Sequence, residues 1–285
     1  MSIADLLVAF QYAFVKNMFI AGLLASVACG IIGTYVVVKR LVFISGGIAH
    51  TCFGGIGLAY WLGFEPMLGA VLFALGTAVT VGITGLKGRV REDSAIGALW
   101  VTGMALGLVF IDRAPGYVPD PISILFGDIL LVKTRDLWLM LILDLIIVLI
   151  VGVMYRQLLA LTFDEEFARI TGIHTDALYI VLLGLIALTV VLLVKVVGVI
   201  LVIALLTLPP TIAGFFTNKM KRIMIIAVLI GMVVTTLGSL LSWEYNVSSG
   251  PVIVLVAVCA LLISLALKRL LTTLSRGANE PTPEP

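Results

Sequence analysis

His50 is the residue of this 285-residue chain whose surroundings most suggest chemistry. It stands in the stretch ISGGIAHTCFGGIG, whose glycines would let a second backbone or an ion come close. A histidine within an apolar stretch needs a partner, and imidazole is a common ligand of transition metals. Two interpretations follow: His50 binds a metal on an ion path, or it packs and hydrogen-bonds to a neighbouring carbonyl group.

Two further positions interrupt apolar stretches. Asp144 could line a polar path or pair with Lys195, and we favour the ion pair. Pro209, followed by Pro210, predicts a kink that frees backbone carbonyl groups. Such breaks often line the path in transporters, but kinks also occur where nothing passes.

The segment Leu161–Ile173, LTFDEEFARITGI, concentrates charge in an otherwise apolar region. Its charged residues are Asp164, Glu165, Glu166 and Arg169. Hydrocarbon does not tolerate such a cluster, so the segment must lie in water. Phe163, Phe167 and Ile170 recur at helical spacing, which is typical of a short amphipathic helix on the membrane surface. A solvated loop between two spans is an equally good interpretation of this pattern.

Several classes of function are excluded or disfavoured. The chain has no G-x-x-x-x-G-K-[ST] motif, so it does not hydrolyse a nucleotide, and its two histidines support no Ser/His/Asp set. Cys29, Cys52 and Cys259 lack CxxC spacing and are typical of packing residues. A net charge of +2 does not suggest a nucleic-acid partner.

The elements that must position these residues are membrane-spanning helices, because 61% of residues are hydrophobic and 12% are charged. We therefore predict an all-α, polytopic bundle of eight or nine spans. The predicted spans are Met18–Val38, Ile44–Gly63, Met67–Leu86, Ala95–Ile111, Leu137–Tyr155, Leu178–Val194, Val196–Phe216, Ile223–Trp243 and Pro251–Leu267. The glycines could break the second span, and Lys195 alone separates the sixth from the seventh.

The predicted organisation is an interfacial segment (1–17), a transmembrane domain (18–268) and a polar tail (269–285). If 161–173 is cytoplasmic, thirteen of the eighteen Lys and Arg residues fall on the cytoplasmic side, so the N-terminus lies outside. Within the outer segment Asp112–Asp136, ISILFGDILLV is too short to span and predicts a short or re-entrant helix.

Five motifs occur in an order that resembles the permease subunits of bacterial ABC importers for zinc, manganese and iron. They are REDSAIG (Arg91–Gly97), ILFGDIL (Ile124–Leu130), LTFDEEFARITGI (Leu161–Ile173), VVGVILVIALLTLPPTIA (Val196–Ala213) and SSGPVIVL (Ser248–Leu255). The resemblance extends from about Met18 to Leu267.

This resemblance implies a homodimeric permease in the plasma membrane, with a cytoplasmic ABC ATPase on each protomer and a metal-loaded solute-binding protein outside. It implies no permanently bound cofactor, since the divalent metal ion is the cargo. Segment 161–173 would contain the coupling helix that enters a groove of the ATPase. The residues with that role would be Phe163, Asp164, Glu165, Phe167 and Ala168.

The family's metal motif, roughly G-D-x-x-S-H-x-x-x-P-G, is incomplete in this chain. His50 and Gly55 match it, whereas Gly46 takes the place of Asp and Gly54 that of Pro. His50 therefore carries over as a metal-pathway residue without a carboxylate one helical turn away. We class Gly46, Gly55, Asp144 and Pro209 as pathway or packing residues. Asn246 also stands where family members often have Asp.

The sequence thus predicts a permease that moves Zn, Mn or Fe ions by alternating access. One alternative keeps the architecture but carries a metal chelate or another small solute. A second is an ion-coupled secondary transporter, which the scarcity of charges within the spans argues against.

Overall fold

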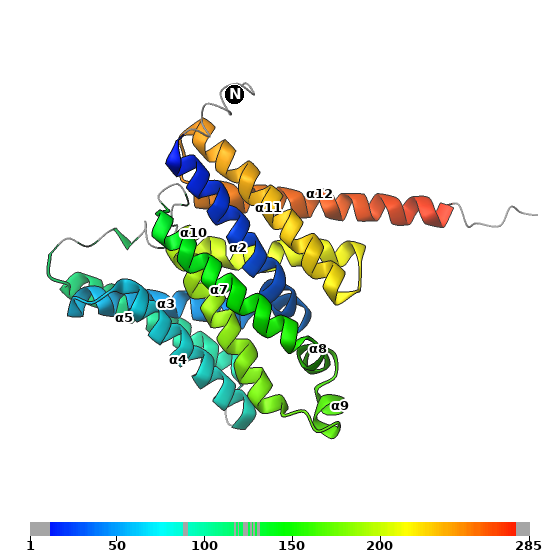
Figure 1. The fold of residues 1–285 in the computed structure, drawn as a ribbon, viewed down its shortest axis with the longest axis horizontal. Coiled ribbons are helices and arrows are strands. Elements are labelled where there is room, and N and C mark those ends of the chain that lie inside the picture. The colour runs from blue at the N-terminus through cyan, green and yellow to red at the C-terminus, as the bar shows by residue number, and fades with distance from the viewer. Residues whose placement is uncertain are drawn as a thin grey trace, which may run out of the picture.

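The computed structural model describes residues 12–87, 91–116 and 132–277, together with residues 118, 120, 121, 125, 127 and 129. Throughout this part of the chain the regular structure is helical (Figure 1). The helices are α2 (Ala13–Val38), α3 (Val42–Leu62), α4 (Pro66–Lys87), α5 (Glu92–Arg113), α7 (Thr134–Val153), α8 (Tyr155–Phe163), α9 (Glu165–Ile170), α10 (Thr175–Phe216), α11 (Met220–Tyr245) and α12 (Ser249–Gly277).

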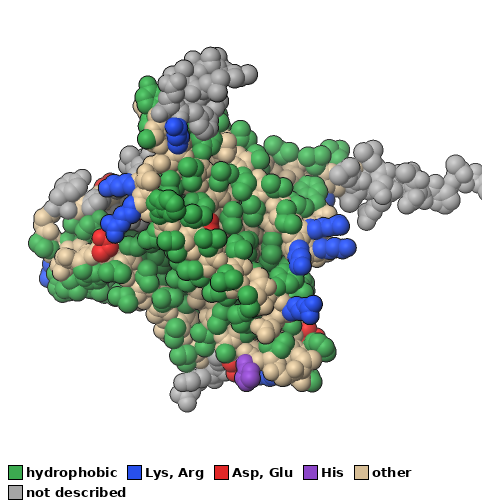
Figure 2. Space-filling view, viewed as in Figure 1, with side chains coloured by type: hydrophobic (Ala, Val, Ile, Leu, Met, Phe, Trp, Pro, Cys, Tyr) green, Lys and Arg blue, Asp and Glu red, His purple; other side chains and the backbone are tan. Residues whose placement is uncertain are grey.

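Nine segments within the described ranges are long and apolar enough to cross a bilayer. Each has 20 to 26 residues, which at about 1.5 Å per residue matches a hydrocarbon core of about 30 Å. The all-α bundle is therefore confirmed, with nine spans rather than eight. Large apolar side chains such as Trp138, Leu145 and Leu149 on α7 are more than 60% exposed, which suits a surface that faces lipid. Figure 2 shows hydrophobic side chains over most of one face, with basic side chains near its edges.

The first and last spans extend beyond their predicted limits. Helix α2 begins at Ala13, and Asn17 near its start donates a hydrogen bond to the Val132 carbonyl oxygen at 3.1 Å. Helix α12 continues to Gly277, because no glycine or proline stops it earlier in the tail. Residues 1–11 and 278–285 lie outside the described ranges, so the three-part division stays a prediction.

The glycines of α3 let neighbouring helices approach without breaking it. Helix α3 is continuous, contrary to the expected weakness of the second span. A Cβ atom at Gly54 would lie 2.7 Å from the carbonyl oxygen of Gly103 in α5, and one at Gly55 would collide with the Gly69 carbonyl of α4. Small residues thus bring three backbones together, as is common between helices in lipid.

Helix α10 contains two spans, and its break lies at Gly198 rather than at Lys195. Gly198 has φ 76° and ψ 166°, a conformation that glycine adopts without strain. Pro209 and Pro210 lie inside the continuing helix, so they do not end the span, and the predicted kink stays a prediction. Pro210 has no backbone N–H group, so the Leu206 carbonyl oxygen lacks its usual helical hydrogen bond. That oxygen packs against Gly33 of α2, where a Cβ atom would collide with it.

The outer segment before α7 is fixed at two described positions. Ile129 is fully buried, and its N–H donates a hydrogen bond to Ser249 Oγ at 3.1 Å. Gly127 lies directly against the backbone of Gly198, so the segment packs on the break in α10. The predicted short or re-entrant helix falls largely on positions outside the described ranges and stays a prediction.

The helices form two groups around α10. Helix α3 packs against α5 and α4, whereas α2 packs against α11, and α10 contacts members of both groups. Helices α8 and α9 follow α7 and lie at the opposite end of the molecule from the start of α2 (Figure 1). This arrangement places the contact between α3 and α5 and the short helix α9 in separate parts of the protein.

Candidate functional site

His50 lies on α3 beside α5, and it is half-buried. Its Nδ1 is 2.9 Å from the carbonyl oxygen of Gly46, one turn earlier. Its ring stacks on that of Trp100 in α5, with centroids 4.1 Å apart and planes 24° apart. Because a carbonyl oxygen can only accept, this hydrogen bond requires the proton on Nδ1 and leaves Nε2 with its lone pair. Both expected features are therefore present together: a carbonyl partner and a nitrogen able to bind a metal.

His50 does not belong to a ready-made metal cage in this single chain. Among the described residues, no group of three or more His, Cys, Asp or Glu side chains could hold one ion. One imidazole offers a weak and transient site, which suits a path that an ion must also leave.

Gly46 differs from the glycines that pack tightly. A Cβ atom there would meet Ile203 and Trp100 at 3.5 Å, which is ordinary van der Waals contact. At Gly47 the same atom would collide with the side chain of Ile96. Packing therefore requires glycine at position 47 but not at position 46. The missing carboxylate at Gly46 is a chemical difference that the fold does not impose.

Asp144 lies within α7, which packs against α2 and α10. It is only 4% exposed, and neither carboxylate oxygen accepts a hydrogen bond within the described part of the protein. The side chain of Lys195 is outside that part, so the predicted ion pair remains a prediction. Gly55 and Pro209 occupy packing positions, against α4 and within α10 respectively.

Segment 161–173 contains the short helix α9, which its own residues stabilise. Asp164 caps it, because its Oδ1 accepts a hydrogen bond from the N–H of Phe167 at 2.8 Å. Ala168 is fully buried and anchors the helix to the rest of the protein. Phe163, Phe167 and Ile170 are 61%, 59% and 84% exposed. The segment thus presents an apolar surface beside charged residues; we call Phe163, Phe167 and Ile170 the α9 surface.

Lys39 attaches this segment to the membrane helices. Its Nζ lies 2.9 Å from Glu165 Oε2 and donates a hydrogen bond of 2.9 Å to the Leu161 carbonyl oxygen. The same Nζ lies 5.6 Å from the ring centroid of Tyr179, whose hydroxyl group donates to Glu92 Oε1 at 3.4 Å. These contacts join α9 to α2, to the start of α10 and to the start of α5.

Sequence reasoning missed this connection. The sequence indicates Lys39 only as one of the basic residues that set the orientation of the protein in the membrane, because its partner Glu165 is 126 positions away. The available signal was a lysine at the end of a span, opposite an acidic segment on the same side of the membrane. Helix α5 begins at Glu92 and carries Trp100, so the contacts lead from α9 toward His50.

Comparisons with known proteins match nearly the whole chain. A model of the ABC 3 transport family matches residues 11–268. A Chlamydia trachomatis protein named "Probable metal transport system membrane protein" is 41% identical over 265 residues, covering 91% of this chain and 89% of that protein. "Manganese transport system membrane protein MntC" of Halalkalibacterium halodurans is 35% identical over 247 residues, covering 87% and 85%. The solved structure "PsaBC from Streptococcus pneumoniae in complex with Fab" contains a chain with a TM-score of 0.83 and 29% identity, covering 92% and 95%.

Proposed function

This chain belongs to the ABC 3 transport family, and on that basis we propose that it is the permease subunit of an ATP-driven importer for a divalent transition metal ion. It acts in the bacterial plasma membrane with a separate ABC ATPase, since its sequence has no nucleotide-binding motif. The single observation that carries the proposal is the α9 surface. Apolar side chains exposed next to Glu165 and Glu166, outside the spans, need a protein partner to cover them.

The ATPase docks on the α9 surface and moves it. Phe163 and Phe167 supply apolar contact area, while Asp164 keeps α9 helical and Glu165 ties it to Lys39. Movement of α9 is therefore passed to α2, α10 and α5 rather than lost in a flexible loop. The spans then alternate between outward-facing and inward-facing states.

The cargo is Mn, Zn or Fe, and His50 contacts it on the way. Two relatives are named for metal or manganese transport, and Nε2 of His50 is the available soft ligand on α3. His50 is half-buried, so part of its side chain remains open to a partner. A homodimer would supply two imidazoles to one ion, and a solute-binding protein outside would deliver it.

A second cargo, a metal chelate or another small solute, has one observation in its favour. Gly46 supplies no carboxylate, although a Cβ atom there would meet its neighbours only at van der Waals distance, so a bare ion finds few ligands here. An ion-coupled secondary transporter is disfavoured, because Asp144 is the one charged side chain among the buried residues of the described ranges.

Uptake into proteoliposomes that contain the whole complex distinguishes these cargoes. We expect ATP-dependent accumulation of free Mn²⁺, Zn²⁺ or Fe²⁺. Uptake of a chelate but of no free ion would favour the second cargo. Accumulation without any ATPase subunit would instead point to a secondary transporter.

Co-purification with the ATPase tests the docking surface. Phe167→Asp puts a charge on the α9 surface and should abolish recovery of the ATPase, while Glu165→Lys should weaken it. The exposed residue Glu166 provides the control, since Glu166→Gln leaves the apolar side chains in place. Normal ATPase recovery with Phe167→Asp and Glu165→Lys would refute docking at α9.

A further inference from the structure

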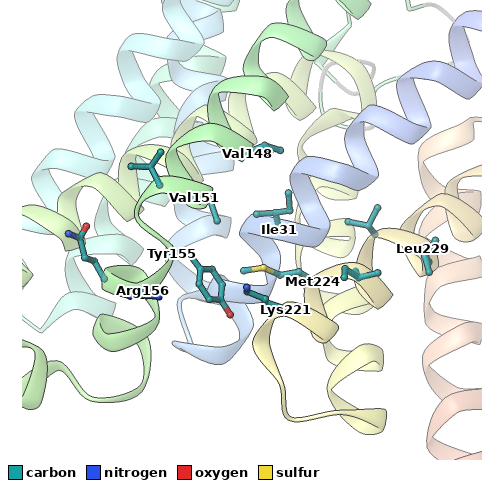
Figure 3. Close-up of a pocket in the computed structure, with 13 residues that line it drawn as sticks. Ile31, Val148, Val151, Tyr155, Arg156, Lys221, Met224 and Leu229 are labelled. Atoms are coloured by element: carbon teal, nitrogen blue, oxygen red, sulfur yellow. The ribbon is translucent and has the colours of Figure 1, made fainter.

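An open cleft of about 780 Å³ lies between α7, α8, α2 and α11, and its lining includes neither His50 nor the residues of the α9 surface. Its apolar walls come from Val148 and Val151 of α7, Ile31 of α2, and Met224 and Leu229 of α11 (Figure 3). Leu229 is 56% exposed and Val148 45% exposed, so the cleft opens to the outside of the helix bundle. In a bilayer, an opening of this kind faces the acyl chains.

The charge of the cleft is confined to one end. Arg156 of α8 and Lys221 of α11 line it there, beside Tyr155 (Figure 3). Lys221 Nζ lies 4.9 Å from the ring centroid of Tyr155. Neither cation has an acidic partner within the described part of the protein, although both are exposed. Burial raises the pKa of the Tyr155 hydroxyl, so this group stays neutral and does not offset the two charges.

The spacing of these features fits one kind of molecule. From Val148 to the end of α7 at Val153 the chain advances five residues, or roughly 7.5 Å along the helix axis, and α8 begins at Tyr155 just beyond. The apolar walls thus lie at membrane depth, and the cations lie where α7 gives way to α8, on the side predicted to be cytoplasmic. A ligand that fits must carry a negative group at one end and a long apolar part below it.

We propose that this cleft binds an anionic glycerophospholipid of the cytoplasmic leaflet. Its phosphate accepts hydrogen bonds from Arg156 and Lys221, and one acyl chain lies along Val148, Ile31 and Leu229. A second copy of this chain fits less well, because a two-fold contact at the cleft would bring the same cations together. The lipid would bridge α8, which leads into α9, and α11, and would thereby set how firmly the segment bearing the α9 surface is held.

Native mass spectrometry of the purified complex in detergent, titrated with defined lipids, tests this proposal. The probes are phosphatidylglycerol and phosphatidylcholine with identical acyl chains. The double variant Arg156→Gln/Lys221→Gln should bind phosphatidylglycerol about 30-fold more weakly, given about five-fold for each basic residue. The variant Lys268→Gln/Arg269→Gln is the matched control, since it removes two basic residues from α12 without touching the cleft. Its affinity for phosphatidylglycerol should stay within about two-fold of wild type.

A second variant tests the apolar part separately. Val148→Trp fills the cleft and should reduce binding of both lipids to a similar extent. The charge variant should weaken phosphatidylglycerol more than phosphatidylcholine, because the choline cation offsets the charge of the phosphate in the latter. Equal affinity of wild type for the two lipids would overturn the proposal. Unchanged phosphatidylglycerol binding by the double variant would overturn it as well, and a changed ratio of monomer to dimer would then identify a second copy as the occupant. These lipid measurements need no transport, so they stand apart from any failure of the proposed cargo.

Discussion

A single nitrogen, Nε2 of His50, is the most direct link between this structure and metal chemistry. The Gly46 carbonyl fixes the other ring nitrogen at 2.9 Å, and Trp100 holds the plane of the ring. An imidazole held in this orientation loses little conformational freedom when it binds an ion.

Replacement of His50 by alanine should lower metal uptake by about ten-fold or more, because the imidazole ligand is lost from the path. The measurement is ATP-dependent uptake into proteoliposomes, with ATPase recovery as a check on assembly. His174→Ala is the control, since His174 is exposed before the start of α10. Uptake by His50→Ala at the wild-type rate would remove this residue from the ion path.

Gly46→Asp should create the carboxylate–imidazole pair that this chain lacks. A Cβ atom at Gly46 has room, and residues 46 and 50 lie on the same face of α3. We expect about ten-fold tighter Mn²⁺ binding by equilibrium dialysis, since carboxylate oxygen suits manganese. Gly47→Asp is the contrasting variant and should destabilise the protein by collision with Ile96. If Gly46→Asp left the affinity unchanged, the ion would pass elsewhere.

At the level of helices, Lys39 links α9 to α2 through its contact with Glu165, and its side chain is only 15% exposed. Lys39→Gln should cut uptake several-fold while the ATPase still co-purifies, because a hydrogen bond to a charged group contributes about 1.5–3 kcal/mol. The exposed pair between Arg169 and Asp176, 2.8 Å apart, provides the comparison. Arg169→Gln should change uptake little, since exposed ion pairs contribute about 0–1 kcal/mol. Equal effects of the two variants would mean that Lys39 has no special part in coupling.

The contact between α3 and α5 depends on the absence of side chains. Gly54→Val would force a Cβ atom toward the Gly103 carbonyl and should destabilise the protein by about 1–3 kcal/mol or more. Gly76→Val is the matched control, because nothing lies within 4 Å of that position. Unfolding can be followed with a thiol-reactive dye in a Cys259→Ser background, since Cys29 and Cys52 are buried. Similar midpoints for both valine variants would contradict the close approach.

For the molecule as a whole, hydropathy predicted the nine spans of the described ranges well, because a segment that crosses a bilayer must form a long apolar helix. It could not place the break in α10. The sequence signal of Pro209 and Pro210 is strong, yet the helix continues there. Around it, the hydroxyl groups of Thr207 and Thr211 bond back to carbonyls one turn earlier, at 2.8 and 2.6 Å. The chain turns instead at Gly198, against Gly127 of a segment distant in sequence.

The candidate functional residues also differ in how far the sequence alone could identify them. His50 and the α9 surface could be selected as candidates from the sequence, because a lone histidine and a charged, aromatic segment stand out locally; their roles stay predictions. The role of Lys39 was not, since it arises from contacts across 126 positions. The looser packing at Gly46 could not be predicted either, because a sequence does not distinguish a tightly packed glycine from one whose Cβ position is free of clashes.

The exposed apolar side chains of α9 also bear on how the cell handles this protein. If, as proposed, an ATPase covers Phe163, Phe167 and Ile170 on the cytoplasmic side, a subunit without it exposes the kind of apolar surface that proteases and chaperones recognise. Unpaired copies should therefore be degraded faster than assembled ones. Pulse-chase labelling should give a shorter half-life when the ATPase gene is deleted, and a polar variant of Ile170 should lengthen it. The abundance of the permease would then follow the supply of its partner.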